Sequence, residues 1–434
     1  HRRVADALRL DLGGLGRDDL GRLTGIAVHE REAGRTGAAA EAYAAAAERA
    51  AAVFAHRTAI DLADAALALG HPEVRRLHVL IGRARTRLGD YGEAVIALEA
   101  AAADPVNKTV YVHAGTYRPR ATGQALIWFN ARHDGITLEA VGDVILTAAN
   151  PDVADKSAPS YPAVVNHVVY FGDGISRTTI FRGFKVTGAN NFTTGSGEKS
   201  PIESDEIRKT VFFYTDGGGI KIYARSYPTI EDVEIYDNYA SPCAGGVSVE
   251  HLGQPQDSVL FRNCIFRNNR TQTTGSALDL LHGSAATVEN CLFVGNVANL
   301  GVDVVGLLTG GEFHPEHGSG AITVFADSKL TMSRSTVTGN WSGVDDAGRG
   351  SSYVDSIFWK NTLTGGISPG KRYELDLEDG SGVRGSFIHG DINDLRGTIR
   401  KELNTFDPPD PRFDARFVPQ APEYGKVGYR PVRH

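Results

Sequence analysis

A four-residue pattern, made of an apolar residue, two variable residues and an asparagine, returns along the second half of this 434-residue chain. Successive asparagines are separated by 31, 27, 44 and 21 residues, which is near the length of one structural unit in a solenoid. Units this short have to stack, because a single unit cannot bury its own apolar face. The five occurrences are Ile235–Asn238, Phe266–Asn269, Phe293–Asn296, Val337–Asn340 and Phe358–Asn361.

Small-residue pairs stand before a short alternating strand in the same repeats. Glycine permits a sharp entry into such a strand. Asparagine tolerates left-handed backbone angles at a turn, and its amide can bond to the coils above and below. We therefore expect an asparagine ladder along the solenoid. The small pairs are Gly218-Gly219, Gly245-Gly246, Ser276-Ala277 and Gly320-Ala321.

Alternation along the strands predicts which side chains face the core. In the second strand of each coil, two cysteines fall in one column, about 4.8 Å apart if they are in-register neighbours. That spacing is awkward for a disulfide, so we expect buried free thiols. The inward columns are Ile220, Val247, Leu278 and Ile322, then Ile222, Val249, Leu280 and Val324, and in the second strand Val233, Cys264, Cys291, Ser335 and Ser356.

The stretch NKTVYVHAGTYRP opens the strand-rich part of the chain, with Ala114, Gly115, Thr116 and Tyr117 at its centre. It resembles the first coil of right-handed parallel β-helices of the pectate-lyase-like superfamily. The small-residue pair followed by the asparagine pattern also resembles repeats of bacterial surface β-helices, including adhesin passenger domains. The resemblance implies a mainly β fold, with a right-handed parallel β-helix over residues 106–396.

Residues 1–105 differ sharply in composition, because alanine, leucine and arginine recur there with helical periodicity. The segment RTRLGDYGEAVIALEAAAADP resembles a tetratricopeptide repeat, and Gly34, Ala39, Tyr43 and Ala46 occupy matching positions earlier in the chain. We expect an α-helical, tetratricopeptide-like domain. It serves either as a cap or spacer for the solenoid or as a groove for a partner protein.

The tail, residues 397–434, contains six prolines and spaced aromatic residues. Proline removes backbone donors, so we expect an extended segment rather than regular structure. Two interpretations stay open for this tail. In the first it is a strap that packs along the solenoid or seals its open end, and in the second it docks onto another subunit.

Charge and hydropathy exclude two classes of protein. The formal net charge of −7 argues against nucleic acid as the main partner, since phosphate binding needs a basic surface. No run of about eighteen apolar residues is present, so we expect no membrane-spanning segment. The chain begins at His1 rather than Met, and we expect that a leader or a longer N-terminal region was removed. We also expect a bacterial-like protein of the periplasm, cell surface or medium.

The outward positions of the first strands gather the polar residues of a candidate site. Lys221, Ser248, Asp279 and Thr323 form one predicted column, and Tyr223, Glu250, Leu281 and Phe325 form the next. One position further, Ala224, His251, His282 and Ala326 align, with Arg225 and Asp327 beyond.

In the polysaccharide lyases that the fold resembles, a cation or basic group neutralises a uronate carboxylate and a base removes the neighbouring carbon proton. The resemblance implies His251 or His282 as the base and Arg225 or Lys221 as the neutralising group. Glu250 and Asp279 are then possible Ca²⁺ ligands, and Tyr223 and Phe325 can lie against sugar rings. A polar solenoid face that does no chemistry is the alternative.

The 44-residue spacing contains an insertion, in which His314, Glu316 and His317 stand close together. A His-x-x-His pair with a carboxylate can bind zinc or another divalent ion. A long loop that shapes a groove or contacts a partner is the alternative interpretation.

Two hypotheses of function follow. In the first, the chain is a non-catalytic extracytoplasmic binding or scaffold protein, whose helical domain and tail meet protein partners. In the second, it is a polysaccharide lyase or related carbohydrate-active enzyme acting on an acidic polysaccharide.

Overall fold

The computed structural model describes two compact units of the chain. The first contains His1–Ala97, Val110–Tyr117 and Glu139–Ile145, and the second contains Leu98–Thr109, Arg118–Leu138 and Leu146–His434. The predicted domain boundaries near residues 105 and 396 stay predictions. Within the units, the structure describes residues 1–11, 20–53, 55–74, 76–78, 80–81, 101–104, 106, 108–190, 216–240, 243–253, 255–281, 283–298, 300, 320–363, 372–378 and 380–432.

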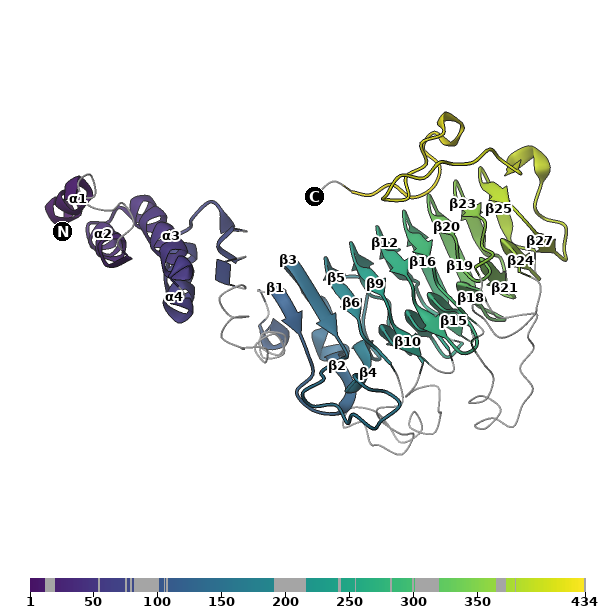
Figure 1. The fold of residues 1–434 in the computed structure, drawn as a ribbon, viewed down its shortest axis with the longest axis horizontal. Coiled ribbons are helices and arrows are strands. Elements are labelled where there is room, and N and C mark those ends of the chain that lie inside the picture. Colours follow the sequence, from purple (N-terminus) through teal and green to yellow (C-terminus); the bar gives the residue numbers. More distant parts are fainter. Residues whose placement is uncertain are drawn as a thin grey trace. The chain divides into compact units, whose positions relative to one another are not determined.

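Helices make up the N-terminal part of the first unit (Figure 1). Helix α3 buries alanines at a spacing of three, four and seven residues, which forms one apolar stripe. Alanine side chains let helices approach closely, and the stripe packs with residues of α2, α4 and the following helical turns. The helices are α1 (Arg2–Asp11), α2 (Leu20–Glu32), α3 (Thr36–Ala52) and α4 (His56–Ala68).

A helical hairpin forms where the sequence predicted the earlier one. Gly34 lies between α2 and α3 with a φ of 74°, a left-handed angle that suits glycine. Tyr43 and Ala46 are buried against the neighbouring helices. The hairpin predicted around Leu88, Gly89 and Tyr91 lies outside the described residues, and the tetratricopeptide repeat is therefore not confirmed.

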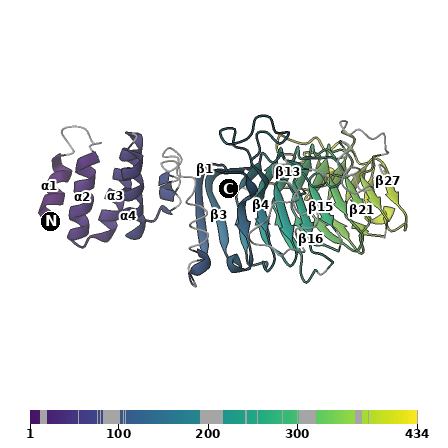
Figure 2. The same cartoon turned by 90° about the horizontal axis from the view of Figure 1, so that it is seen from below.

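The second unit is dominated by parallel strands stacked coil upon coil (Figure 1). The first strand of each coil joins a nine-stranded sheet, which we name sheet 2. Figure 2 shows the strands of successive coils side by side toward β27. Sheet 2 contains β2 (Gly123–Phe129), β4 (Val165–Phe171), β7 (Ile220–Tyr223), β11 (Val247–Glu250), β15 (Leu278–Leu281), β18 (Ile322–Val324), β21 (Val344–Asp346), β24 (Leu375–Leu377) and β27 (Ile392–Asp394).

The later strands of each coil form the other large sheet, which we name sheet 1. Most coils contribute two strands to it. Two short strands, β10 (Tyr239–Ala240) and β14 (Arg270–Thr271), form a small parallel pair. Short 3₁₀ turns η1 (Ala131–His133), η3 (Lys401–Leu403) and η4 (Pro422–Tyr424) complete the described elements. Sheet 1 contains β1 (Thr109–Tyr117), β3 (Thr137–Thr147), β5 (Ile180–Arg182), β6 (Lys185–Thr187), β8 (Thr229–Glu231), β9 (Glu234–Tyr236), β12 (Val259–Arg262), β13 (Ile265–Arg267), β16 (Ala285–Glu289), β17 (Leu292–Val294), β19 (Lys329–Ser333), β20 (Thr336–Thr338), β22 (Ser352–Val354), β23 (Ile357–Trp359), β25 (Gly382–Arg384), β26 (Phe387–His389) and β28 (Thr405–Phe406).

The register of the strands confirms the predicted inward columns. Ile220 pairs with Val247, Val247 with Leu278, and Leu278 with Ile322. All four side chains are fully buried. The side chains of the second predicted column are also fully buried, and these are Ile222, Val249, Leu280 and Val324. The predicted right-handed parallel β-helix and its apolar core are therefore present.

The asparagine ladder is present, but the expected backbone reason for it was wrong. The residue before each ladder asparagine takes the left-handed angle, as Asp237, Asn268 and Lys360 do. Each asparagine itself turns inward. Asn269, for example, donates from Nδ2 to Ile235 O at 2.9 Å and to Asn296 Oδ1 at 3.1 Å, and such bonds tie adjacent coils together.

The two aligned cysteines belong to a second ladder. The backbone N–H of Cys264 donates to Cys291 Sγ at 3.3 Å, and that of Cys291 donates to Ser335 Oγ at 3.0 Å. Ser335 and Ser356 continue the pattern at 3.2 Å. The cysteines are buried free thiols, as predicted, and the Cys291 sulfur accepts a bond where the following coils use a hydroxyl.

The proline-rich tail packs back onto sheet 1 of its own solenoid. Tyr424 is fully buried and stacks on Phe387, with ring centroids 4.4 Å apart. The backbone N–H of Tyr429 donates to Thr336 Oγ1 at 3.0 Å, and that of Arg430 donates to Asn290 Oδ1 at 2.7 Å. The tail therefore covers outward apolar side chains of several coils, as the first of the two interpretations expected.

Replacing one ladder asparagine should destabilise the solenoid. We expect Asn269→Ala to lower the free energy of unfolding by about 3 kcal/mol, because it leaves several buried backbone and amide groups without partners. The neighbouring Asn268 is exposed and has a φ of 54°, so Asn268→Gly should change stability by less than about 0.5 kcal/mol. Thermal and urea unfolding measure both changes. Equal losses in the two variants would contradict the ladder's role.

Crowding the tail at Gly428 should loosen it from the solenoid. A Cβ there would lie 2.4 Å from Ile357 Cδ1, whereas a Cβ at Gly425 meets nothing within 4 Å. Both glycines have positive φ, so Gly425→Ala is a matched control for backbone strain. We expect Gly428→Ala to cost about 1–3 kcal/mol more than the control, because the core beneath it is already packed. Limited proteolysis of the tail would detect the difference, and equal cleavage in both variants would refute it.

Candidate functional site

The strands of sheet 2 bring the predicted polar column together. Lys221 pairs in register with Ser248, Ser248 with Asp279, and Asp279 with Thr323. The column is not a solvated face, however, because Lys221, Ser248 and Asp279 are each 0% exposed.

Lys221 is the centre of a buried ionic network. Its Nζ lies 2.9 and 2.8 Å from the two carboxylate oxygens of Asp216. The same nitrogen lies 2.9 Å from Glu250 Oε2 and 3.2 Å from Ser248 Oγ. Ser248 in turn donates to Asp216 Oδ2 at 2.6 Å. One ammonium group therefore serves two carboxylates and a hydroxyl.

Burial and mutual attraction shift the pKa values of this network. Burial raises the pKa of Asp216, and the attraction of Lys221 does not offset that effect. Burial alone would lower the pKa of Lys221, but the carboxylates of Asp216 and Glu250 outweigh burial and raise it. The lysine is held as an ammonium ion, so it is a poor proton acceptor for a substrate.

Asp279 belongs to the same buried region but makes no contact with the lysine nitrogen. Its Oδ2 accepts a hydrogen bond from Thr274 Oγ1 at 2.8 Å. Burial raises the pKa of Asp279 to about 8, so its carboxyl is largely protonated at neutral pH. Glu250 is bound to the Lys221 ammonium. The two predicted Ca²⁺ ligands, Glu250 and Asp279, therefore bond to other side chains of the protein in this structure.

Aromatic side chains lie at one end of the network. Tyr223 packs against Tyr170, and its ring centroid is 5.8 Å from Lys221 Nζ. The Tyr170 ring is tilted by 51° against that of Trp128, with centroids 4.3 Å apart. Tyr223 is 3% exposed, and Phe325 is half-buried three coils away. Tyr223, proposed as a sugar-stacking residue, therefore contributes to packing in this structure.

His251 turns away from the Lys221 column at the end of β11. Its Nε2 lies 3.0 Å from Ser226 O, and its Nδ1 accepts from the Ala285 N–H at 3.2 Å. Burial lowers the pKa of His251 to about 4, so the ring is neutral at physiological pH. Both ring nitrogens bond to backbone groups of other coils, and this geometry gives the histidine a structural role instead of the predicted role of a base.

Arg225 also has a partner of its own. It is paired with Asp173 through Nε at 2.9 Å and Nη2 at 2.5 Å. The guanidinium is more than half exposed, and it points to the preceding coil. It does not join the Lys221 network. The predicted base and the predicted carboxylate-neutralising arginine therefore do not converge with Lys221.

Several predicted residues lie outside the described part of the chain. These are His282 and the insertion residues His314, Glu316 and His317, so their proposed roles stay predictions. Among the residues that the structure does describe, no group of three or more His, Cys, Asp or Glu side chains is arranged to hold a metal ion.

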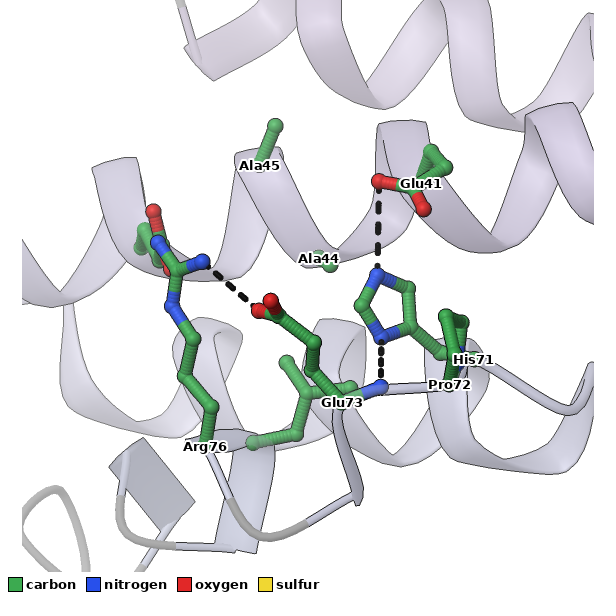
Figure 3. A pocket seen from close by; sticks show the side chains of 9 residues that line it. Glu41, Ala44, Ala45, His71, Pro72, Glu73 and Arg76 are labelled. Atoms are coloured by element: carbon green, nitrogen blue, oxygen red, sulfur yellow. Dashed lines mark hydrogen bonds and ion pairs between the residues drawn. The ribbon is translucent and has the colours of Figure 1, made fainter.

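A separate pocket lies on the helical unit, between α3 and residues 71–77 (Figure 3). Its volume is about 270 Å³, with Ala44, Ala45 and Leu77 among its lining residues. Figure 3 shows His71 pointing toward Glu41, with its Nε2 3.4 Å from the carboxylate. The Arg76 guanidinium is 2.5 Å from Glu48 and 2.7 Å from Glu73.

Sequence reasoning missed Asp216, which is the closest partner of Lys221. Asp216 stands just before a run of three glycines, outside the aligned strand positions, and no spacing rule joins it to Lys221. The signal that would have found it is a carboxylate five residues before a lysine whose side chain occupies an outward strand position. The pocket of the helical unit was also not predicted by residue, because it depends on how α3 packs against the next segment.

One protein-family model matches the chain. It is described as a right-handed β-helix region and matches residues 172–314, which include strands of both sheets. No curated protein and no solved structure matches the chain at a significant level. No helix among the described residues is long and apolar enough to cross a membrane.

The neutral state of His251 predicts an acid-dependent loss of stability. Because its pKa is lowered from 6.5 to about 4, the folded chain binds this proton more weakly than the unfolded chain does. The stabilisation from the neutral ring is complete above pH 6.5 and is lost as the pH falls toward 4. We expect the difference in unfolding free energy between the wild type and His251→Asn to shrink by about 3 kcal/mol over this range. A difference that stays constant with pH would show that the ring is not buried in its neutral form.

Proposed function

We propose that this chain is a non-catalytic binding or scaffold protein built on a right-handed β-helix. The observation that carries the proposal is that the Lys221 amino group is buried and bonded to the carboxylates of Asp216 and Glu250. A lyase that used this column would need a base or cation that reaches substrate. In this chain those groups bond to one another.

The two other candidate groups support the same conclusion. Both nitrogens of His251 bond to backbone groups, and Arg225 is paired with Asp173. A solenoid with its polar groups used internally is rigid, and rigidity is what an elongated binding surface needs. Location outside the cytoplasm, at a bacterial cell surface or in the periplasm, is part of this proposal and rests on the β-helix family match.

The helical unit supplies the surface for a protein partner in this proposal. Its pocket combines small apolar residues on α3 with charged side chains at the rim, such as Glu48, Glu73 and Arg76. Side chains of a partner can insert over Ala44 and Ala45 and meet the charged groups at the rim. The tail contributes less, because Tyr424 and Tyr429 are buried against its own solenoid.

Filling the pocket should weaken binding of the partner. Ala45 is exposed on α3 and lines the pocket, so Ala45→Leu adds bulk there without disturbing the core. We expect about tenfold weaker association, equivalent to ~1.4 kcal/mol, measured by size-exclusion chromatography with light scattering and confirmed by titration with the purified partner. Ala52→Leu, exposed at the end of the same helix but outside the pocket, is the matched control. A wild-type chain that elutes strictly as a monomer with no recoverable partner would overturn the proposal.

An assay for lyase activity separates the two hypotheses. Uronate polymers cleaved by β-elimination give products with a new double bond, which absorbs in the ultraviolet. We expect no absorbance increase with a panel of uronate polymers, with or without Ca²⁺. An increase that Lys221→Met abolishes would replace the scaffold proposal with the lyase hypothesis.

A further inference from the structure

The Asp216, Lys221 and Glu250 triad carries charges that the fold keeps away from water. Asp216 and Lys221 are both 0% exposed, and Glu250 is 8% exposed. Removing an ion from water costs several kcal/mol, even when a partner of opposite charge is near. Two carboxylates against one ammonium leave a negative charge uncompensated. Any reaction that eliminates the Asp216 and Lys221 charges is therefore favoured by burial.

We infer that Lys221 and Asp216 condense to form an intramolecular amide bond, with Glu250 as the catalytic acid and base. The side chains are already in contact, and the product is a covalent link between Lys221 Nζ and Asp216 Cγ. This modification site is independent of the proposed binding surface, since it concerns buried side chains of sheet 2 and not the pocket of the helical unit.

The step balances without any added reagent. The Lys221 ammonium gives one proton to the Glu250 carboxylate, which passes it to an oxygen of Asp216, so a neutral amine faces a neutral carboxyl group. The lone pair of the amine then attacks Asp216 Cγ, so a C–N bond forms and one Cγ–O bond breaks. The departing hydroxyl takes a second proton from the nitrogen and leaves as water. Glu250 ends as a carboxylate.

The distances place each group for this step. Contact of Nζ with both oxygens of Asp216, at 2.9 and 2.8 Å, puts the nitrogen beside the carboxyl carbon. Glu250 Oε2 is 2.9 Å from the same nitrogen, within reach for proton transfer. The Ser248 hydroxyl donates to Asp216 Oδ2 at 2.6 Å and can stabilise the negative charge that develops there. Groups held in contact react with effective concentrations on the order of 10⁵ M or more.

The position of the link gives it a structural purpose. Asp216 and Lys221 flank Gly217, Gly218 and Gly219, and glycine is the residue that loses most conformational freedom on folding. These glycines cannot be replaced by stiffer residues, because a Cβ on Gly219 would lie 2.6 Å from Gly246 O. A covalent bridge across the run restricts the unfolded chain at this point and fixes the entry into β7.

The mass of the intact chain tests this inference directly. We expect the purified 434-residue chain, denatured before mass spectrometry, to weigh one water molecule less than its sequence requires. Tandem mass spectrometry of proteolytic fragments should place the link between Asp216 and Lys221. An intact mass equal to that of the sequence would overturn the inference, whatever the variants do.

Variants separate the amide from other losses of water. Asp216 precedes a glycine, and a succinimide at that bond would also remove one water, but it does not need the lysine. We expect Lys221→Arg and Glu250→Gln to restore the full mass, and Asp279→Asn to retain the loss, because Asp279 does not contact Lys221 Nζ. Water loss that persists in Lys221→Arg would overturn the inference. Circular dichroism of each variant tests whether it is folded.

Discussion

The fold depends on the in-register stacking of each coil on the next. Backbone N–H groups of one coil donate to carbonyl oxygens of its neighbour, as Ile220 N does to Gly246 O at 2.9 Å. This pairing brings identical strand positions into columns, so one apolar position per coil becomes a continuous core. A slip of one residue would exchange the inward and outward faces. The apolar columns at Ile220 and Ile222 therefore fix the register of the whole solenoid.

Close stacking also explains the residues at the turns. Gly245 and Gly246 have ordinary backbone angles, yet a Cβ on either would meet backbone atoms of the next coil within 2.4 Å. Glycine is required there for approach rather than for conformation. At the second turn, a residue with a left-handed angle precedes each ladder asparagine, and the asparagine amide then joins three coils. At its far end the ladder finishes on Glu374, whose carboxylate accepts from the Asn361 N–H at 3.0 Å. Burial raises the pKa of Glu374 to about 7.

On sheet 2, polar residues at outward strand positions are buried, so they bond to other protein groups and not to water. Lys221 and Glu250 occupy outward strand positions, where water usually solvates such side chains. In this chain they are buried and bond to one another instead of to water. The same reasoning applies to outward apolar residues, because the tail covers Ile357, which is fully buried, and Phe387, which is half-buried.

The sequence by itself determined the parallel β-helix, its inward columns, the asparagine ladder and the stacked thiols, because these follow from local periodicity repeated at a fixed interval. It also placed Lys221, Ser248 and Asp279 in one column. Only the tertiary structure decided what those groups touch. Asp216 reaches Lys221 from outside the aligned strands, and His251 turns into the stack to bond with Ser226 and Ala285. Such contacts depend on side-chain direction and on covering segments, and neither has a period along the chain.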